Sequence, residues 1–350
     1  MPTPARLLSL ASVSPPHEFM QGEVASAARR LFGPKFRDFE RLFPVFRNTG
    51  ILTRQAVMPM EWYFEDRTWP ERTAAYLQGA ADLFCDTARQ ALDRAGLSAA
   101  DVDTIVTVSS TGIATPSLEA RVMGRMGFRD GVARVPVFGL GCAGGVTGLS
   151  LAGRLAQARP GSVVLMVAVE LCTLACRLDE MTSANIVATA LFGDGAAACV
   201  VRAGGRGEAL AELTGAAEHT WPDSLDIMGW NIDPLGFGVV LNRSIPAFVE
   251  DNMRPVLEVA LARMGLAIGD VDRFICHPGG AKVVEALEKC LDLGQGALTI
   301  EREVLADHGN MSSPTVLFVL ERALAAGVRG NLVATALGPG FTATAVSMAA

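Results

Sequence analysis

A cysteine at position 142 lies in the glycine-rich segment Gly-Leu-Gly-Cys-Ala-Gly-Gly, which follows a short apolar run. This pattern predicts a strand that turns through glycines into a helix, with Cys142 at the helix start. Free backbone N–H groups and the positive end of the helix dipole at that point favour a thiolate. We expect the glycines to leave space for a substrate. Taken alone, the segment fits a buried cysteine in a packing crossover equally well.

His277 and Asn310 are the best candidates to assist such a thiol. His277 ends the apolar run Phe274–Cys276 and precedes Pro-Gly-Gly, so we expect it to project from a strand end. Asn310 lies in Gly-Asn-Met-Ser-Ser before an apolar helix, a place where asparagine also serves as a simple cap. An imidazolium stabilises a thiolate, and His and Asn donors together hold negative charge that develops on a carbonyl oxygen.

Alternating strand and helix patterns surround these candidates. We expect a long region of surface helices and loops before residue 72. Strands are predicted at 7–13, 102–108, 134–138, 162–169, 197–202, 273–276 and 331–337, and helices at 73–95, 146–158, 182–189, 246–264, 282–291 and 313–326. This alternation indicates a largely parallel, helix-covered α/β sheet with polar loops at its strand ends.

Length and composition narrow the function classes. A chain of 350 residues exceeds one usual core, and the glycines at 204–207 mark a weak boundary between two halves. A net charge of −7 without a basic run argues against a nucleic-acid partner. Glycines, threonines or prolines interrupt both long uncharged stretches, 135–153 and 330–350, so neither predicts a membrane span. The N-terminus has no apolar signal core, so we expect a cytoplasmic protein.

The cysteines predict reduced thiols. Seven are present, an odd number, and most lie in apolar runs. Cys172 and Cys176 are not followed by a second pair of metal-ligand spacing, so no metal site is expected.

Motifs in these segments resemble those of the type III polyketide synthases, the chalcone synthase-like family, over nearly the whole chain. The motifs are Gly-Cys142-Ala-Gly-Gly, Leu191-Phe-Gly-Asp-Gly-Ala196, Cys276-His277-Pro-Gly-Gly, Gly309-Asn310-Met-Ser-Ser and Gly338-Pro-Gly-Phe341, in family order. The resemblance implies a thiolase-like fold, two related α/β halves in a layered αβαβα arrangement. Residues 1–205 would carry the nucleophilic cysteine and residues 206–350 the histidine and asparagine. It also implies a homodimer.

The resemblance further implies roles for individual residues. Cys142 would carry the acyl group, while His277 and Asn310 would promote decarboxylation of malonyl-CoA and steady the enolate. Phe192 would be the gate between a CoA tunnel and the cavity. The cavity would be lined by Ser110, Thr111, Cys172, Ala175, Val239, Ser312 and the terminal-loop residues Gly338 and Pro339, with Thr115 reaching into the partner's cavity. Arg47 and Arg54 would contact CoA phosphates, and CoA thioesters would be substrates without any further cofactor.

Residues that differ from those of the plant flavonoid-forming members indicate which kind of acyl starter the cavity accepts. Those members have an aromatic residue where this chain has Val239, and threonines where it has Cys172 and Ala175. The resulting wall is more apolar and suits an aliphatic acyl chain, since each buried CH₂ contributes roughly 0.8 kcal/mol. We therefore expect iterative decarboxylative condensation of malonyl-CoA onto a medium- or long-chain acyl-CoA, with closure to an alkylpyrone or alkylresorcinol.

Three other interpretations remain open from sequence. A 3-oxoacyl-ACP synthase III also uses Cys, His and Asn, although its histidine usually stands in His-Gln-Ala-Asn. A papain-like peptidase uses the same residue types with other flanking motifs. A catalytically silent thiolase-fold protein that binds acyl-CoA is the non-enzyme alternative. The starter length, the number of extensions and the mode of ring closure depend on cavity shape rather than on motifs.

Overall fold

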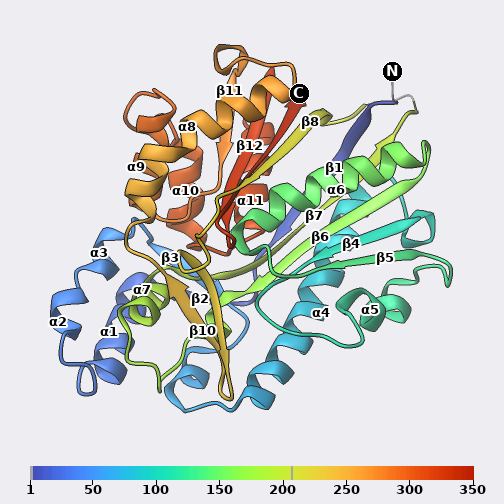
Figure 1. Cartoon of the computed structure of the whole chain (residues 1–350). Coiled ribbons are helices and arrows are strands. Elements are labelled where there is room, and N and C mark those ends of the chain that lie inside the picture. The colour runs from blue at the N-terminus through green and yellow to red at the C-terminus, as the bar shows by residue number, and fades with distance from the viewer. Residues whose placement is uncertain (1–2, 206–207) are drawn as a thin grey trace.

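The computed structural model describes residues 3–205 and 208–350, and one mixed sheet runs through this part of the chain (Figure 1). The sheet has nine strands in the order β11-β12-β13-β8-β1-β7-β6-β4-β5. These strands are β1 (Ala5–Val13), β4 (Thr104–Val108), β5 (Ala133–Val137), β6 (Val163–Leu171), β7 (Asp194–Ala203), β8 (Ala211–Thr220), β11 (Arg273–Cys276), β12 (Asn331–Gly338) and β13 (Thr342–Ala349).

The sheet consists of two half-sheets that meet along β1 and β8. Strands β1 and β4 to β7 form the N-terminal half-sheet, and β8 with β11 to β13 forms the C-terminal one. The joint is short, because only the first residues of β1, Ala5 to Leu7, pair with β8, from Ala211 to Leu213. The boundary predicted after residue 205 adjoins residues 206 and 207, which lie outside the described residues.

Helices cover both half-sheets and fill the space between them. The longer helices are α4 (Trp69–Arg94), α5 (Leu118–Met126), α6 (Gly144–Ala158), α8 (Ile245–Arg263), α9 (Ala281–Cys290), α10 (Thr299–His308) and α11 (Thr315–Ala325). Helices α6 and α11 contact strands of both half-sheets, α4 packs on the N-terminal one, and α8, with α9 beside it, packs on the C-terminal one. The layers are therefore helix, sheet, helix, sheet, helix, and the predicted αβαβα arrangement is confirmed.

Side-chain alternation along the strands produces these layers. On β6, Leu165 and Val167 join the buried cluster that includes α4, whereas Val164 and Met166 join the cluster that includes α6 and α11. Successive side chains of a strand point to opposite faces, so a strand covered on both faces is apolar at every position. That is why β6 is a continuous apolar run in the sequence.

The prediction of a largely parallel sheet is wrong. Five strand pairings in the sheet are antiparallel, and three are parallel. The prediction missed β8 and β13, and antiparallel neighbours need only a tight turn between them rather than a helical crossover. Every strand and helix with a predicted range is present, with ends displaced by a few residues, while α5 and α10 are absent from the predicted ranges.

A smaller cap lies beside the sheet, at the lower left of Figure 1. It contains β2 (His17–Met20), α1 (Gln21–Phe32), α2 (Phe39–Leu42), α3 (Val45–Asn48), β3 (Thr53–Ala56), α7 (Ser183–Leu191), β9 (Met228–Asp233) and β10 (Gly236–Leu241). Phe32, Phe39 and Phe46 are buried in it against Ile186 and Ala190 of α7. The region before residue 72 is thus more than surface loops, because it has an apolar core of its own.

Short 3₁₀ helices connect these elements at η1 (Met60–Phe64), η2 (Ala99–Asp101), η3 (Gly141–Ala143), η4 (Cys172–Ala175) and η5 (Ile268–Asp270).

Close packing of α6 against the start of α11 gives a first prediction. A Cβ atom added at Gly145 would overlap the backbone carbonyl oxygen of Ser313, which cannot move as a side chain would. We expect Gly145→Ala to lower the free energy of unfolding by about 2 kcal/mol. The matched control is Gly124→Ala in α5, where an added Cβ meets nothing within 4 Å and the gain in helix propensity is about 0.5–1 kcal/mol. Thermal denaturation compares the two, and equal effects would contradict the packing argument.

Candidate active site

Cys142 lies in η3, immediately before α6, and only 7 % of it is exposed. Gly141 takes a positive φ of 49°, a conformation that favours glycine. The turn is fixed from the neighbouring strand, because Ser110 Oγ accepts hydrogen bonds from Gly139 N at 3.1 Å and Gly141 N at 3.2 Å. The predicted strand, glycine turn and helix are all present, and the loop after β4 holds the turn in place.

The glycines around Cys142 serve packing rather than access. A Cβ on Gly141 would lie 2.7 Å from Pro339 Cδ, and one on Gly144 would lie 2.6 Å from Val108 Cγ1. From the other side, a Cβ on Gly338 would lie 2.7 Å from Ala143 Cβ. The expectation that these glycines leave space for a substrate is therefore wrong for the faces that point into the protein. These glycines let the end of β12 and the loop before α11 approach the cysteine closely.

Asn310 contacts the thiol and is held firmly. Its Oδ1 lies 3.9 Å from Cys142 Sγ and accepts a hydrogen bond from Ser312 N at 2.8 Å. Its Nδ2 donates to the carbonyl oxygen of Gly279 at 3.2 Å. The backbone is fixed as well, since Asn310 N donates to Leu191 O at 2.8 Å. An amide NH₂ group has two donors, so one direct contact still permits a second to a ligand.

His277 follows β11, as predicted, and is 5 % exposed. Its backbone N donates to Thr335 O at 2.9 Å, whereas both ring nitrogens lack a hydrogen-bond partner among the described residues. A Cβ on Gly279 would lie 3.8 Å from Nε2, so the ring lies beside the same turn that binds Asn310. Buried polar atoms are nearly always paired. An imidazole left free on both sides indicates a ligand position.

Burial dominates the electrostatics of the thiol and the imidazole. It raises the pKa of Cys142 to about 11, and hydrogen bonding with Ser312 and Asn310 only partly opposes it. Burial also lowers the pKa of His277 to about 4. The helix start was expected to favour the thiolate, but desolvation is the larger effect and favours the neutral thiol. We expect a charged pair to form only when the thiol proton passes to the imidazole, so that each charge has a partner.

Glu170 is a site residue that the sequence analysis missed. It is fully buried at the end of β6 and accepts hydrogen bonds from Ser110 N at 2.9 Å, Thr111 Oγ1 at 2.8 Å and Ser313 Oγ at 3.0 Å. Burial raises its pKa to about 7, and its charge raises the pKa of Cys142. A single carboxylate at the end of a nine-residue apolar strand was the available signal.

Phe192 and a second missed residue, Trp230, form an aromatic wall. The two ring centroids lie 6.5 Å apart, and Trp230 Nε1 donates to Ser110 O at 2.8 Å. Val239 is buried and pairs with Trp230 across the β9–β10 hairpin. Trp230 escaped notice because β9 was not predicted.

Two family models match most of the chain. "Chalcone and stilbene synthases, N-terminal domain" matches residues 64–205, and the corresponding C-terminal domain matches residues 212–349. The chain belongs to the chalcone and stilbene synthase family. This protein is thus a type III polyketide synthase, an acyltransferase that forms carbon–carbon bonds, and the resemblance seen in its motifs is confirmed.

Individual relatives agree with this assignment. The chain is 40% identical to 1,3,6,8-tetrahydroxynaphthalene synthase of Streptomyces peucetius subsp. caesius, over 94% of this chain and 89% of the relative. It is 30% identical to alpha-pyrone synthesis polyketide synthase-like Pks18 of Mycobacterium tuberculosis, over 97% of this chain and 90% of the relative. The crystal structure of 1,3,6,8-tetrahydroxynaphthalene synthase from Streptomyces coelicolor A3(2) matches with a TM-score of 0.92 at 29% identity. The match covers 98% of this chain and 99% of that structure.

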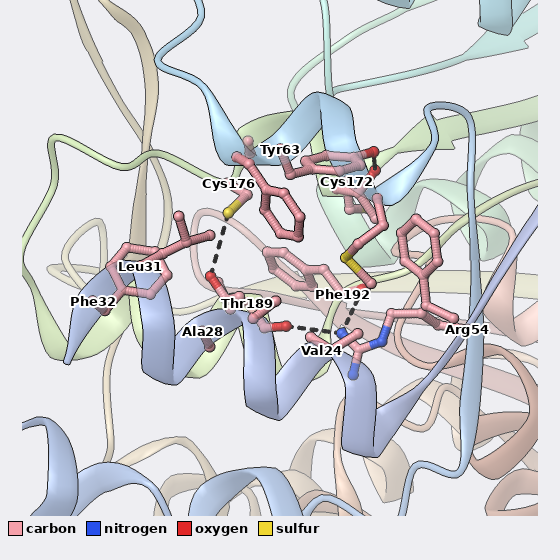
Figure 2. A pocket seen from close by; sticks show the side chains of 17 residues that line it. Val24, Ala28, Leu31, Phe32, Arg54, Tyr63, Cys172, Cys176, Thr189 and Phe192 are labelled. Carbon is pink, nitrogen blue, oxygen red and sulfur yellow. Dashed lines mark hydrogen bonds between the residues drawn. The ribbon is translucent and has the colours of Figure 1, made fainter.

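The synthase has an apolar pocket between α1, η1, η4 and α7, and Phe192 forms part of its wall (Figure 2). Its volume is about 60 Å³, and the predicted wall residues Cys172, Ala175 and Phe192 line it. Cys172 lies near enough to Cys142 that a charge on one thiol raises the pKa of the other. One lining residue of the pocket, Cys172, is therefore within electrostatic range of Cys142.

The remaining predicted residues lie in different settings. Thr111 Oγ1 bonds Glu170 and accepts from Leu171 N at 2.9 Å, so with Ser110 it supports the site instead of lining an open cavity. Thr115 is exposed on the loop before α5. Ser312 has a positive φ of 61°, which turns the chain between Asn310 and α11.

The two predicted CoA contacts do not share a surface. Arg47 is exposed on α3. Arg54 is only 2 % exposed, and its guanidinium donates to the carbonyl oxygens of Thr189 and Phe192, each at 2.9 Å. The expected contact between Arg54 and a CoA phosphate is therefore wrong, because the group is enclosed and both of its terminal nitrogens donate to groups of the protein itself.

Over residues 3–205 and 208–350, no three His, Cys, Asp or Glu side chains gather as metal ligands would. None of the helices in those ranges is long and apolar enough to span a bilayer.

Removal of the imidazole tests the proton-transfer argument. We expect His277→Ala to slow alkylation of Cys142 by iodoacetamide at pH 7 at least tenfold, because no imidazole remains to accept the proton of a thiol whose pKa burial raises to about 11. The rate in this variant should rise as the pH increases toward that value. Mass spectrometry of the Cys142 peptide measures it, with Cys176 as an internal reference. A variant rate equal to wild type at pH 7 would contradict the coupling.

Proposed function

We propose that the synthase condenses malonyl-CoA with an aliphatic acyl-CoA starter, using Cys142 as nucleophile and His277 with Asn310 as its partners. The observation that carries the proposal is the buried His277 ring without hydrogen-bond partners, beside the turn that fixes Asn310 against the thiol. The family assignment supplies the reaction class.

Acylation begins with proton transfer from Cys142 Sγ to the neutral imidazole. The thiolate attacks the thioester carbonyl, the bond from the carbonyl carbon to the CoA sulfur breaks, and the imidazolium returns the proton to the leaving CoA thiolate. Neutral imidazole at neutral pH suits this step, because the base must be free of a proton before the starter arrives.

Chain extension uses His277 and Asn310 as hydrogen-bond donors. Malonyl-CoA loses CO₂, and the enolate oxygen is held by N–H donors of His277 and Asn310. The enolate carbon then attacks the acyl thioester on Cys142, and the sulfur leaves as a thiolate that can accept the next acyl group. Donors held in place before the reaction stabilise the developing charge without reorganisation.

An aliphatic starter is supported by the pocket next to Phe192. Its lining is mostly apolar, from Val24, Leu31, Phe32 and Met60 together with Cys172. A volume of about 60 Å³ holds roughly four water-sized groups, which corresponds to a short alkyl segment. Phe19, Ala27, Met60 and Phe64 also border an open surface groove, so a longer chain would have to displace this shared wall. The expected products are alkylpyrones or alkylresorcinols.

A second candidate is synthesis of a polyhydroxynaphthalene from malonyl-CoA alone. It is favoured by the 40% identity to a 1,3,6,8-tetrahydroxynaphthalene synthase. The apolar pocket has no evident use in that reaction, and for this reason we favour the acyl starter.

Incubation with acyl-CoAs of increasing length plus malonyl-CoA, followed by mass spectrometry, distinguishes the candidates. We expect chain-extended products with wild type and none with Cys142→Ala. Cys142→Gln, which mimics an acylated site, should keep malonyl-CoA decarboxylation and lose condensation. Cys290→Ala, at a buried cysteine in α9, is the matched control and should behave as wild type. A naphthalene product from malonyl-CoA alone, with no acyl incorporation, would contradict the aliphatic starter.

We also infer that Arg47, which is exposed on α3, contacts a CoA phosphate, since a guanidinium pairs phosphate well.

We infer as well that the synthase forms a homodimer. Two large apolar side chains, Ile113 and Phe138, are 47% and 53% exposed, and Ile113 lies on the loop of Thr115. Both residues follow the paired strands β4 and β5, and exposed apolar groups that gather at one edge of a sheet are typical of interaction surfaces.

A charge on this surface tests the dimer. We expect wild type to elute with a dimer's mass in size-exclusion chromatography with light scattering, and Phe138→Glu to shift toward monomer because a buried unpaired charge is costly. Val259→Glu, at an exposed apolar position on α8 (54% exposed), is the matched control. A monomeric wild type would contradict the inference.

A further inference from the structure

Arg54 is one of the largest fully buried side chains of the protein. It comes from β3, and its guanidinium points toward the end of α7, as Figure 2 shows with Thr189 and Phe192. Nη1 donates to Thr189 O and Phe192 O, each at 2.9 Å, and Nη2 donates to Ala190 O at 2.7 Å and to Gln21 Oε1. One side chain thus binds three backbone carbonyls in four consecutive residues.

The helix end explains why a cation is stable there. The last carbonyls of a helix have no intrahelical partners and carry partial negative charge. Burial lowers the pKa of Arg54 to about 10, so the group stays protonated at neutral pH. The nearby Asp194 is bonded to Val57 N and to Thr173 instead. Arg54 is therefore held mainly by carbonyl groups of α7 and Phe192, supported by Gln21.

These contacts fix the backbone of Phe192 on one side. On the other side, Gly193 N donates to Asn310 O at 3.1 Å, and Phe192 N donates to Ala188 O at 2.8 Å. The Phe192 ring lies between the apolar pocket and Trp230. The side chain of Asn310 has its own bonds to Gly279 and Ser312, while its backbone is bonded to Leu191 and Gly193 on either side of Phe192.

We propose that Arg54 is a positioning residue that sets the place of the Phe192 ring and thereby which acyl chains the pocket accepts. This inference rests on the proposed function, because it assumes that the starter chain occupies the pocket. Arg54 touches no reacting atom, and it acts through the carbonyl of Phe192. A planar guanidinium can reach several carbonyls at once, whereas a lysine ammonium is a single point of charge.

The test compares Arg54→Lys, Phe192→Ala and the double variant. Each is assayed for kcat/KM with octanoyl-, dodecanoyl- and hexadecanoyl-CoA in the presence of malonyl-CoA. We expect Arg54→Lys to reduce the ratio between the best and the poorest starter by about threefold to tenfold. Arg54→Lys should add nothing in the Phe192→Ala background, since coupled residues are not additive. The control Arg302→Lys, at a partly buried pair with Glu288 on α9, should keep the wild-type profile.

A substrate-independent readout accompanies these assays. Hydrogen–deuterium exchange of the peptide spanning residues 186–194 should be faster in Arg54→Lys, because the amides of Phe192 and Gly193 lose their support, and unchanged in Arg302→Lys. If Arg54→Lys does not fold, Gln21→Ala replaces it and should produce smaller changes in the same direction.

The outcomes separate the two proposals. Failure of wild type to extend any acyl-CoA overturns the proposed function alone, and exchange then decides the placement of Phe192. Unchanged exchange in Arg54→Lys, an unchanged starter profile, or independent additive effects with Phe192→Ala would overturn the role of Arg54.

Discussion

Close backbone approach around Cys142 is the constraint on which the rest of the site depends. The loop carrying Asn310 reaches the thiol because Gly145 presents no side chain to Ser313, and the end of β12 reaches it because Gly338 presents none to Ala143. Helices α6 and α11 therefore form one central layer between the two half-sheets. Because each half supplies part of the site, the cysteine and its partners have their geometry only when both halves are packed together.

Much of the fold was readable from sequence for a physical reason. Strands covered on both faces are uniformly apolar, so β6 and β11 were recognised directly. Strands β8 and β9 each have an exposed side and irregular polarity, and they were missed together with the antiparallel character of the sheet. Cys142, His277 and Asn310 were found because each lies beside a glycine turn at the end of an element. Glu170 and Trp230 were missed because their importance comes from neighbours far away in sequence.

Burial changes the pKa of each ionisable group of the site. It raises the pKa of Cys142 and of Glu170 and lowers the pKa of His277. All three shifts favour the neutral form, as desolvation requires. The resting thiol and imidazole are therefore neutral, whereas Glu170, with a pKa of about 7, exchanges its proton near neutral pH. Charge develops on the thiol and the imidazole when a proton moves or a substrate arrives. The three hydrogen bonds on Glu170 serve this arrangement mechanically, because they tie the Ser110 loop to the loop after Asn310.

Arg54 shows where residue type misleads. An arginine near the N-terminal region of a CoA-using enzyme suggests a phosphate contact, since a guanidinium pairs phosphate well. A helix C-terminus offers the same charge complementarity, with carbonyl groups in place of phosphate oxygens. Only the fold distinguishes them, because β3 runs beneath the end of α7 and encloses the side chain with Gln21. A fully buried arginine bound to carbonyls on both sides of a turn restricts that turn more than any exposed ion pair would. The turn it restricts carries Phe192, whose ring lines the apolar pocket and lies beside Trp230.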